Sequence, residues 1–209
     1  MRNLRLGLML VVSVLWAGAV WADAPVPQTG QEISYDANNP QRDDGALQQG
    51  LKLPTPRFTD KGNGTVKDNL TGLIWLKNAN CPGSTRAWQT ALSDVASLNS
   101  AGTMNGNNCG DISGKKGDHR TDWRLPNIRE LFSLVDFAFF GPAISNAAGT
   151  GQGSGSDPFS NFQPASEYWS STTIRVNSIA AWIVDFFSGN VDGFGKTGVT
   201  FVIAVRGGS

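Results

Sequence analysis

The sequence contains few of the residues that catalytic chemistry or nucleic-acid binding requires. Its 209 residues include one histidine and two cysteines, and the 17 Lys and Arg residues equal the 17 Asp and Glu residues in number. A balanced charge gives no reason to expect nucleic acid or an anionic membrane as a partner. After residue 20 no apolar run is long enough to span a bilayer.

Three stretches resemble functional motifs, but each lacks a required residue. The Gly-rich run 149–156 does not follow a strand and does not end in Lys-Ser/Thr, which excludes a phosphate-binding loop. The turn 60–68 has Gly62 and Gly64 where a calcium loop needs oxygen ligands. No Ser or Cys nucleophile motif accompanies His119, so nothing indicates that it acts as a catalytic base. We therefore predict a protein that is not an enzyme and has no metal site and no cofactor.

The first residues have the pattern of a secretory signal peptide. Arg2 and Arg5 precede the apolar run 6–20, and small residues follow at Ala22 and Ala24. We predict a signal peptide over residues 1–22, with a retained membrane anchor as the alternative. Its removal leaves 15 basic against 17 acidic residues. The chain is then expected to be secreted, periplasmic or on the cell surface, with no membrane span.

Both cysteines lie in the part expected to be exported. A single pair in an oxidising compartment is most simply a disulfide, and we predict a Cys81–Cys109 bridge. Metal binding by two cysteines and one histidine is the weaker alternative.

The composition divides the remaining chain at about residue 56. Residues 23–56 are rich in Gln, Asn, Asp, Pro and Gly, which predicts a flexible polar tail or linker. Residues 57–209 have the pattern of one α+β domain. Short strands are expected at 57–59, 65–68 and 73–76, followed by a helix from Ser84 or Thr85 to about Asn99, a polar loop over 100–121, strands at 168–173 and 180–186, a hairpin into 191–194, and a last strand at 199–206.

Residues 122–131 contain the clearest local signal. Pro126 forces the preceding residue into an extended conformation, and Asn127 with Glu130 forms a capping-box pattern at the start of a helix that ends near Asp136. We expect Trp123 and Leu125 to be buried. Arg124 and Glu130 are expected to form a partly buried polar brace, together with Asp122. The predicted structural core motif comprises Trp75, Trp88, Trp123, Arg124, Leu125, Pro126, Glu130, Trp169 and Trp182.

Two loops offer candidate binding surfaces. The long loop 137–162 is expected to be functional or mobile, because long loops in compact domains usually are. Lys115, Lys116, His119 and Arg120 form a small basic cluster in the loop 100–121, which we interpret as a solvated surface rather than a site for an anionic polymer.

Several motifs, taken in order, resemble a known family. They are DNLTGLIW at 68–75, DWRLPNIREL at 122–131, YWSSTT at 168–173 and AWIVD at 181–185. Together they resemble the C-terminal domain of the Legionella collagen-like adhesin, a family of exported bacterial domains associated with glycosaminoglycan binding. The resemblance implies a C-type lectin-like fold, in which two helices pack on small, mostly antiparallel sheets and long loops meet the ligand. Formylglycine-generating enzymes share that fold.

The sequence departs from these relatives in ways that limit the comparison. It lacks the late cysteines of formylglycine-generating enzymes and the Glu-Pro-Asn or Gln-Pro-Asp triplet of calcium-dependent lectins. The collagen-like Gly-X-Y stalk of the adhesin is also missing. The resemblance therefore implies neither oxidase chemistry nor calcium-dependent sugar binding.

The leading hypothesis is a non-enzymatic, adhesin-like binding module that recognises a polysaccharide or a surface protein through its loops. The ligand-binding residues are predicted in the loop 137–162 and the last hairpin: Asp185, Asn190, Asp192, Phe194 and Lys196. One alternative is a structural subunit of a surface appendage or layer that assembles through the 23–56 tail. Another is a carbohydrate-active enzyme that uses Asp185 and Asp192 as paired carboxylates.

Overall fold

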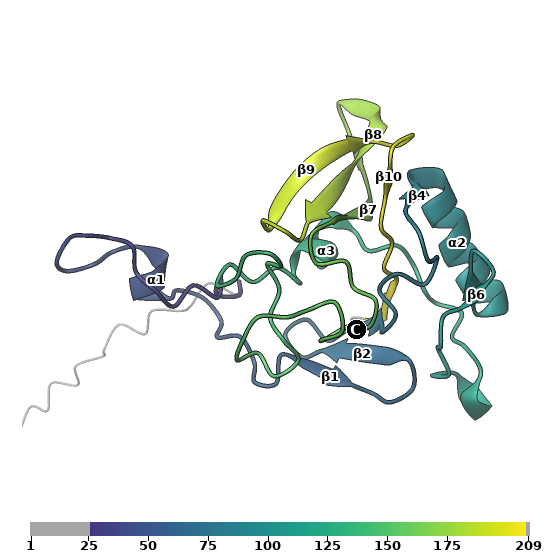
Figure 1. Ribbon diagram of the computed structural model, residues 1–209, viewed down its shortest axis with the longest axis horizontal. Helices are drawn as coiled ribbons and strands as arrows, with labels where there is room; N and C mark the ends of the chain where they lie inside the picture. Colours follow the sequence, from purple (N-terminus) through teal and green to yellow (C-terminus); the bar gives the residue numbers. More distant parts are fainter. Residues whose placement is uncertain (1–25, 208–209) are drawn as a thin grey trace, which may run out of the picture.

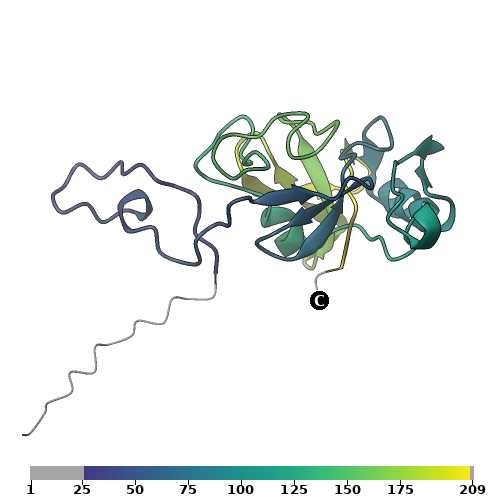
Figure 2. The same ribbon diagram turned by 90° about the horizontal axis from the view of Figure 1, so that it is seen from below.

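A computed structural model describes residues 26–207. The predicted signal peptide, residues 1–22, lies outside the described part of the chain. The described part is an α+β fold of short helices and small sheets, as Figures 1 and 2 show. The predicted α+β class is confirmed, and the C-type lectin-like assignment stays a prediction that depends on the resemblance.

The strands form four antiparallel sheets. The largest has the order β1-β2-β3-β11, and a second has the order β7-β8-β9. Two-stranded sheets pair β4 with β10 and β5 with β6. The bounds of the strands are β1 Phe58–Asp60, β2 Thr65–Asp68, β3 Leu73–Leu76, β4 Arg86–Ala87, β5 Thr103–Met104, β6 Asn107–Asn108, β7 Glu167–Ile174, β8 Asn177–Asp185, β9 Asn190–Gly195, β10 Val199–Thr200 and β11 Val205–Gly207.

The helices are short, apart from one. They are α1 Asp44–Leu47, α2 Trp88–Ala101, the 3₁₀ turn η1 Lys115–Gly117 and α3 Ile128–Phe132. The predicted start of the first domain helix at Ser84 or Thr85 is wrong. Residues 86–87 form β4 instead, because they pair with β10, and the helix therefore begins at Trp88.

Two further boundaries differ from the prediction. The helix α3 ends at Phe132 rather than near Asp136, because the chain turns and the Asp136 N–H donates to the Ala143 carbonyl at 3.0 Å. The predicted last strand, 199–206, is divided into β10 and β11. Its middle, residues 201–204, crosses from the β7 sheet to the β3 sheet, where the Leu76 N–H donates to the Ala204 carbonyl. Val202 to Val205 are buried, as the apolar run predicts.

The sheet β7-β8-β9 separates two core clusters. Because side chains alternate along a strand, Trp169 and Ile183 point to one side and Tyr168 and Val184 to the other. The first pair packs in a cluster with α2 and the disulfide, and the second packs in a cluster with β1–β3 and α3. Trp75 and Trp169 are fully buried, as predicted, whereas Trp88 and Trp182 are partly buried.

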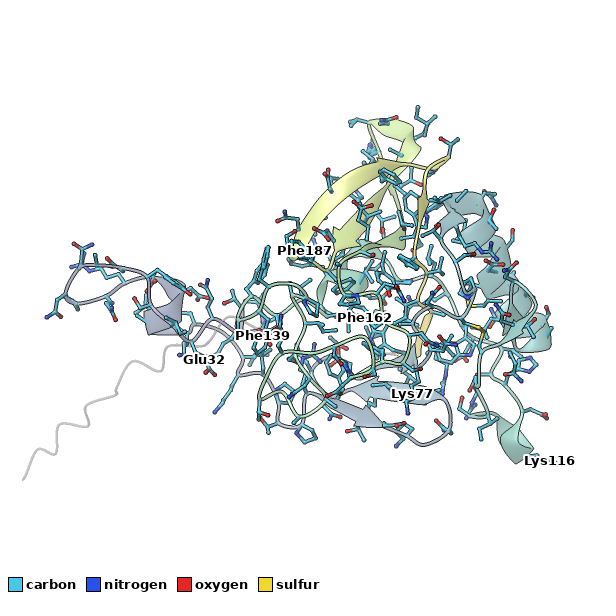
Figure 3. All side chains as sticks on the ribbon, in the orientation of Figure 1. Glu32, Lys77, Lys116, Phe139, Phe162 and Phe187 are labelled. Atoms are coloured by element: carbon cyan, nitrogen blue, oxygen red, sulfur yellow. A yellow bond between two sulfur atoms is a disulfide. The ribbon has the colours of Figure 1, made fainter. Side chains whose placement is uncertain are left out.

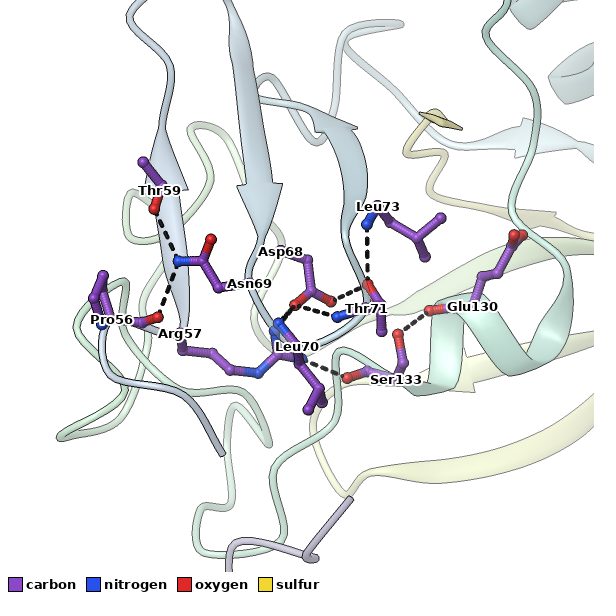
Figure 4. Close-up of polar contacts among 10 residues, drawn as sticks. All are labelled: Pro56, Arg57, Thr59, Asp68, Asn69, Leu70, Thr71, Leu73, Glu130 and Ser133. Atoms are coloured by element: carbon purple, nitrogen blue, oxygen red, sulfur yellow. Dashed lines mark hydrogen bonds and ion pairs between the residues drawn. The ribbon is translucent and has the colours of Figure 1, made fainter. Parts of the chain in front are cut away.

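A buried acidic residue joins the first sheet to α3. The Asp68 carboxylate forms an ion pair with Arg57 and accepts hydrogen bonds from the Leu70 N–H at 2.8 Å and the Thr71 hydroxyl at 2.7 Å (Figure 4). Arg57 also donates to the Ser133 carbonyl at 2.8 Å. The Asp-Asn-Leu-Thr-Gly motif is therefore a structural turn, since its carboxylate is fully buried and paired.

Residues 26–56, which we call the arm, extend from one side of the domain (Figures 1 and 2). The sequence predicts a flexible tail here, but the structure shows a closed loop. Its ends are tied by hydrogen bonds from the Gln28 N–H to the Leu51 carbonyl and from the Leu51 N–H to the Val26 carbonyl, at 2.9 and 2.8 Å. The carboxylate of Asp43 accepts from the Tyr35 N–H and caps α1. Carboxylate acceptors, rather than a hydrophobic core, organise the arm.

Candidate functional site

The segment 122–131 is a joint that holds α3 against the rest of the domain. The predicted capping box is present: the Asn127 side chain accepts from the Glu130 N–H at 3.0 Å, and Glu130 accepts from the Asn127 N–H at 2.9 Å. Trp123 is buried, and its indole N–H donates to Asp111 at 2.8 Å. The Asn99 side chain bonds both backbone groups of Trp123. Every polar group of Trp123 is thus paired within the scaffold.

The predicted polar brace forms with a different arrangement. Arg124 and Glu130 make a two-pronged ion pair at 2.5 and 2.6 Å, but the Arg124 side chain is 44% exposed. Asp122 pairs with Arg206 at 3.8 Å instead of joining them. Burial alone would raise the pKa of Glu130, but the hydrogen bonds from Arg124 and from the Asn127 N–H outweigh it and lower the pKa. The joint is therefore part of the scaffold.

The disulfide lies in the same core cluster as Trp123 and Leu125. Cys81 and Cys109 are bonded, as predicted, and both are buried. In the adjoining loop His119 contacts the Asn99 carbonyl at 3.2 Å and Arg120 donates to the Ser113 carbonyl at 2.8 Å. Two members of the small basic cluster are thus engaged in loop structure. Lys116 lies at the exposed tip of the loop in Figure 3.

The structure divides the five predicted ligand-binding residues into two groups. The β8–β9 register places Asp185, Asn190, Asp192 and Phe194 on one face of the sheet, and Lys196 follows the end of β9. Phe194 packs against Trp169, with ring centroids 5.7 Å apart, and the Lys196 ammonium lies 4.0 Å above the Trp88 ring. These two residues face the core cluster. Asp185, Asn190 and Asp192 lie toward the other end of the strands, and Asn190 and Asp192 are exposed.

A cleft of about 410 Å³ lies beside Asp185 and is lined by Glu167 and Phe201. Burial raises the pKa of Glu167, and the nearby carboxylates of Asp185 and Asp192 raise it further. The sequence analysis missed Glu167. Its position opposite Asp185 in the β7–β8 register follows only once the strand pairing is known.

Exposed phenylalanines gather where the loop 137–162 meets the β8–β9 turn. Phe132 packs on Phe137 at 5.9 Å between ring centroids, and Phe140 packs on Phe187 at 4.5 Å. A side chain at Gly189, in the turn, would contact the Phe137 ring at 3.3 Å, so the turn lies against this pair. We call these rings the phenylalanine patch: Phe132, Phe137, Phe140 and Phe187, which are 36%, 41%, 65% and 43% exposed.

The rest of the loop 137–162 is less exposed than the sequence suggests. Phe159 and Phe162 are buried in the core, and the Gly-rich segment is held by Gln152, whose side-chain amide donates to the Phe140 and Pro142 carbonyls. Only the start of the loop presents aromatic rings to solvent. The sequence signal for these exposed rings is the Phe-Ala-Phe-Phe run at 137–140. Its apolar residues follow neither helix nor strand periodicity, so they do not form the buried face of such an element.

A cleft of about 580 Å³ lies between the arm and the domain. The arm contributes Gln31, Glu32, Tyr35 and Lys52, and the domain contributes residues 136–139 and 149–150. Figure 3 shows Glu32 and Phe139 at this junction. We call it the arm cleft.

Backbone contacts hold the arm against the domain at this cleft. The Phe137 N–H donates to the Thr29 carbonyl at 2.8 Å. Gly30, at φ +92°, lies so close to Asp136 that an added Cβ would come within 1.9 Å of its carboxylate oxygen. Asp136 is buried there, and this burial raises its pKa, although the Ala138 N–H and Arg57 oppose the shift.

Two features are absent from residues 26–207. Within this range no group of three or more His, Cys, Asp or Glu side chains is arranged to hold a metal ion. No described helix has both the length and the apolar character needed to cross a bilayer.

Comparison with protein families agrees with the motif resemblance. The family model of the Lcl C-terminal domain matches residues 64–206, which include the disulfide and the strands from β2 to the start of β11, but not β1. Comparison with curated proteins gives no match. The arm lies before the matched range. Because the match covers more than half of the sequence, the chain belongs to the Lcl C-terminal domain family, an adhesin-related family.

Proposed function

We propose that this protein is an exported, non-enzymatic binding module that recognises a polysaccharide or a surface protein through its loops. The observation that carries the proposal is the phenylalanine patch, in which the loop 137–162 and the β8–β9 turn meet through the Phe140–Phe187 contact. Exposed aromatic clusters on a folded domain are typical of interaction surfaces. Membership of an adhesin-related family supports the same function.

Export is part of the proposal. The Cys81–Cys109 disulfide supports a compartment outside the reducing cytosol, because disulfides form and persist in oxidising environments. The signal-peptide pattern of residues 1–22 supports the same route.

We also propose that the protein has no catalytic activity. Asp185, one of the two carboxylates suggested for a glycosidase, accepts hydrogen bonds from the Phe187 N–H at 2.9 Å and the Ser188 hydroxyl at 2.6 Å. Both of its oxygens are therefore used to build the β8–β9 turn. This arrangement favours a structural role for Asp185 over attack on a glycosidic bond.

Assembly through the arm is the second candidate function. The arm projects from the domain in Figures 1 and 2 and exposes Ile33 and Tyr35 at 65% and 79%. A structural subunit of a surface layer would use such a projection to contact its neighbour. Co-purification of the chain with envelope polymers would favour this function, and a monodisperse monomer in the soluble exported fraction would oppose it.

A paired binding experiment tests the main proposal. The whole chain is applied to a glycan array and used for pull-down from an extract of surface proteins, beside the double variant Phe140→Ala/Phe187→Ala. The matched control is Val176→Ala/Ile179→Ala, which removes exposed apolar side chains from the β7–β8 tip. We expect binding by the parent and the control and loss in the Phe variant. A folded parent that binds nothing in either assay contradicts the proposal.

A further inference from the structure

The arm is a closed loop that makes one wall of a cleft, which is more than a linker requires. The other wall is the start of the loop 137–162, and the two are held together by the Thr29–Phe137 hydrogen bond and by Gly30. Only a residue without a Cβ allows this contact, since a methyl group at position 30 would overlap Asp136. The cleft therefore depends on the contact between the arm and the domain.

Several polar groups in the cleft have no partner within the described chain. The side chains of Gln31, Glu32, Tyr35 and Lys52 make no hydrogen bond or ion pair with another residue in 26–207. By contrast, the side chains of Ser34 and Asp43, which lie outside the cleft lining, bond each other at 2.6 Å. These four side chains are thus available to a ligand, whereas the side chains of Gln28 and Gln48, which also line the cleft, donate to carbonyls within the arm.

The charge of the cleft argues against a polyanion. It has one basic residue, Lys52, and two acidic ones, Glu32 and the buried Asp136. Recognition of sulfate or phosphate groups normally uses several cations, above all arginine, and no arginine lines this cleft. The balance favours an uncharged ligand.

The remaining lining residues indicate a sugar rather than a peptide. The amides of glutamine offer both donors and acceptors, which suits hydroxyl groups, and the rings of Tyr35, Phe137 and Phe139 offer flat apolar faces for the C–H faces of a pyranose. An extended peptide is usually held by the backbone of a sheet edge. The lining segments 28–35, 48–55, 136–139 and 149–150 contain no sheet strand in the described structure.

We infer that the arm cleft is a binding site for a neutral oligosaccharide, and that the arm supplies half of it. A volume of about 580 Å³ is within the range of ligand pockets, about 300–1,000 Å³. The inference rests on the proposed function, because it names the class of ligand and one place where the module takes it. The arm cleft differs from the phenylalanine patch because it includes residues of the arm, which precede the family-matched range.

The test uses the whole exported chain and four neutral pentasaccharides, built from β-1,4-linked glucose, mannose, galactose or N-acetylglucosamine. Binding is detected by saturation-transfer NMR and quantified by calorimetry. We expect at least one pentasaccharide to bind, and Gln31→Ala and Tyr35→Ala to weaken it by about tenfold or more. The matched control is Gln89→Ala, an exposed glutamine on α2, which should bind as the parent does.

Two glycine variants test the part played by the arm. Gly30→Ala should abolish binding, because its methyl group would push the arm off Asp136. Gly62→Ala has the same left-handed backbone, at φ +68°, but its added Cβ meets nothing within 4 Å, so binding should persist. Thermal unfolding of both variants shows whether the domain itself remains folded.

The outcomes separate this inference from the proposed function. Binding of no pentasaccharide, or Gly30→Ala and Gln31→Ala binding as tightly as the parent, overturns the inference. Capture of only a peptide or a sulfated polysaccharide overturns it as well. If Phe140→Ala/Phe187→Ala loses a ligand that Gln31→Ala still binds, the proposed binding function is supported and the inferred site in the arm cleft is contradicted.

Discussion

The two sides of this domain use their aromatic and polar residues in opposite ways. On the side of α2 and the disulfide, Trp123 is buried and its indole N–H is paired with Asp111. On the side of the arm, Phe140 is 65% exposed and Gln31 makes no side-chain hydrogen bond within residues 26–207. The first arrangement adds stability, and the second leaves groups available for a ligand. We propose that the arm side recognises the ligand and that the side of α2 and the disulfide supports the fold.

Replacing Trp123 should show the largest effect. Trp123→Ala removes a buried indole and leaves Asp111 without one of its donors, so we expect the free energy of unfolding to fall by about 3–5 kcal/mol. Urea denaturation measures the change. Trp123→Phe keeps most of the volume and should cost less. A stable Trp123→Ala protein that lost only ligand binding would reverse the assignment of the two sides.

Removing the disulfide should have the next largest effect on the same side. The bridge spans a sequence separation of 28 residues. In the chain-entropy model such a loop contributes about 3–4 kcal/mol by restricting the unfolded chain. The variant Cys81→Ser/Cys109→Ser should therefore unfold at lower urea concentration. Its binding at temperatures where it stays folded should equal that of the parent, because the arm cleft lies elsewhere; a loss of binding there would contradict the division.

The joint at residues 122–131 gives a pH-dependent prediction. The pKa of Glu130 is lowered in the folded protein, so its contribution to stability is present above the pKa of the unfolded chain and is lost as pH falls through the lowered folded value. Glu130→Gln should cost about 0.5–1 kcal/mol at pH 7, since Arg124 is partly exposed, and less at pH 3. Equal costs at both pH values, measured by urea denaturation, would show that the ion pair contributes nothing.

The sequence predicts the supporting side better than the recognising side. Strands β1 to β3, the capping box of Asn127 and the Cys81–Cys109 bridge all follow from local signals or from counting residues. The position of the arm against the domain does not follow from such signals. It depends on contacts between residue pairs about a hundred positions apart, such as Thr29 with Phe137, which no periodicity records.

The five ligand-binding residues predicted in the last hairpin show the same limit. Alternation along β9 places Asp192 and Phe194 on one face, and Lys196 follows directly after the strand. It does not reveal that Phe194 and Lys196 are covered by the rings of Trp169 and Trp88, because those rings come from distant segments. Polar and aromatic residues of a hairpin therefore divide between core and surface according to neighbours that only the fold supplies.

Two phenylalanines of the loop 137–162 should differ in their contribution to stability. Phe140→Ala should change the free energy of unfolding by no more than about 0.5 kcal/mol, because the ring is mostly exposed. Phe162→Ala, at the buried end of the same loop, should cost about 3–5 kcal/mol. Thermal or urea unfolding measures both. Similar costs would mean that the phenylalanine patch is part of the core.

The smallest expected effect concerns Glu167, which lies between the two sides. Burial raises its pKa most, and the carboxylates of Asp185 and Asp192 add to the shift, so its ionisation weakens the folded state as pH rises from the ordinary value through the raised one. Asp192→Asn removes one of these charges, and the pKa of Glu167 should fall toward the ordinary value. Carboxyl-detected NMR titration measures this directly. Asp122→Asn, at a distant exposed acidic residue paired with Arg206, is the control that should leave the pKa unchanged. An unchanged pKa in Asp192→Asn would mean that burial and Asp185 set it, and that the exposed end of β9 does not act on the 410 Å³ cleft beside Asp185.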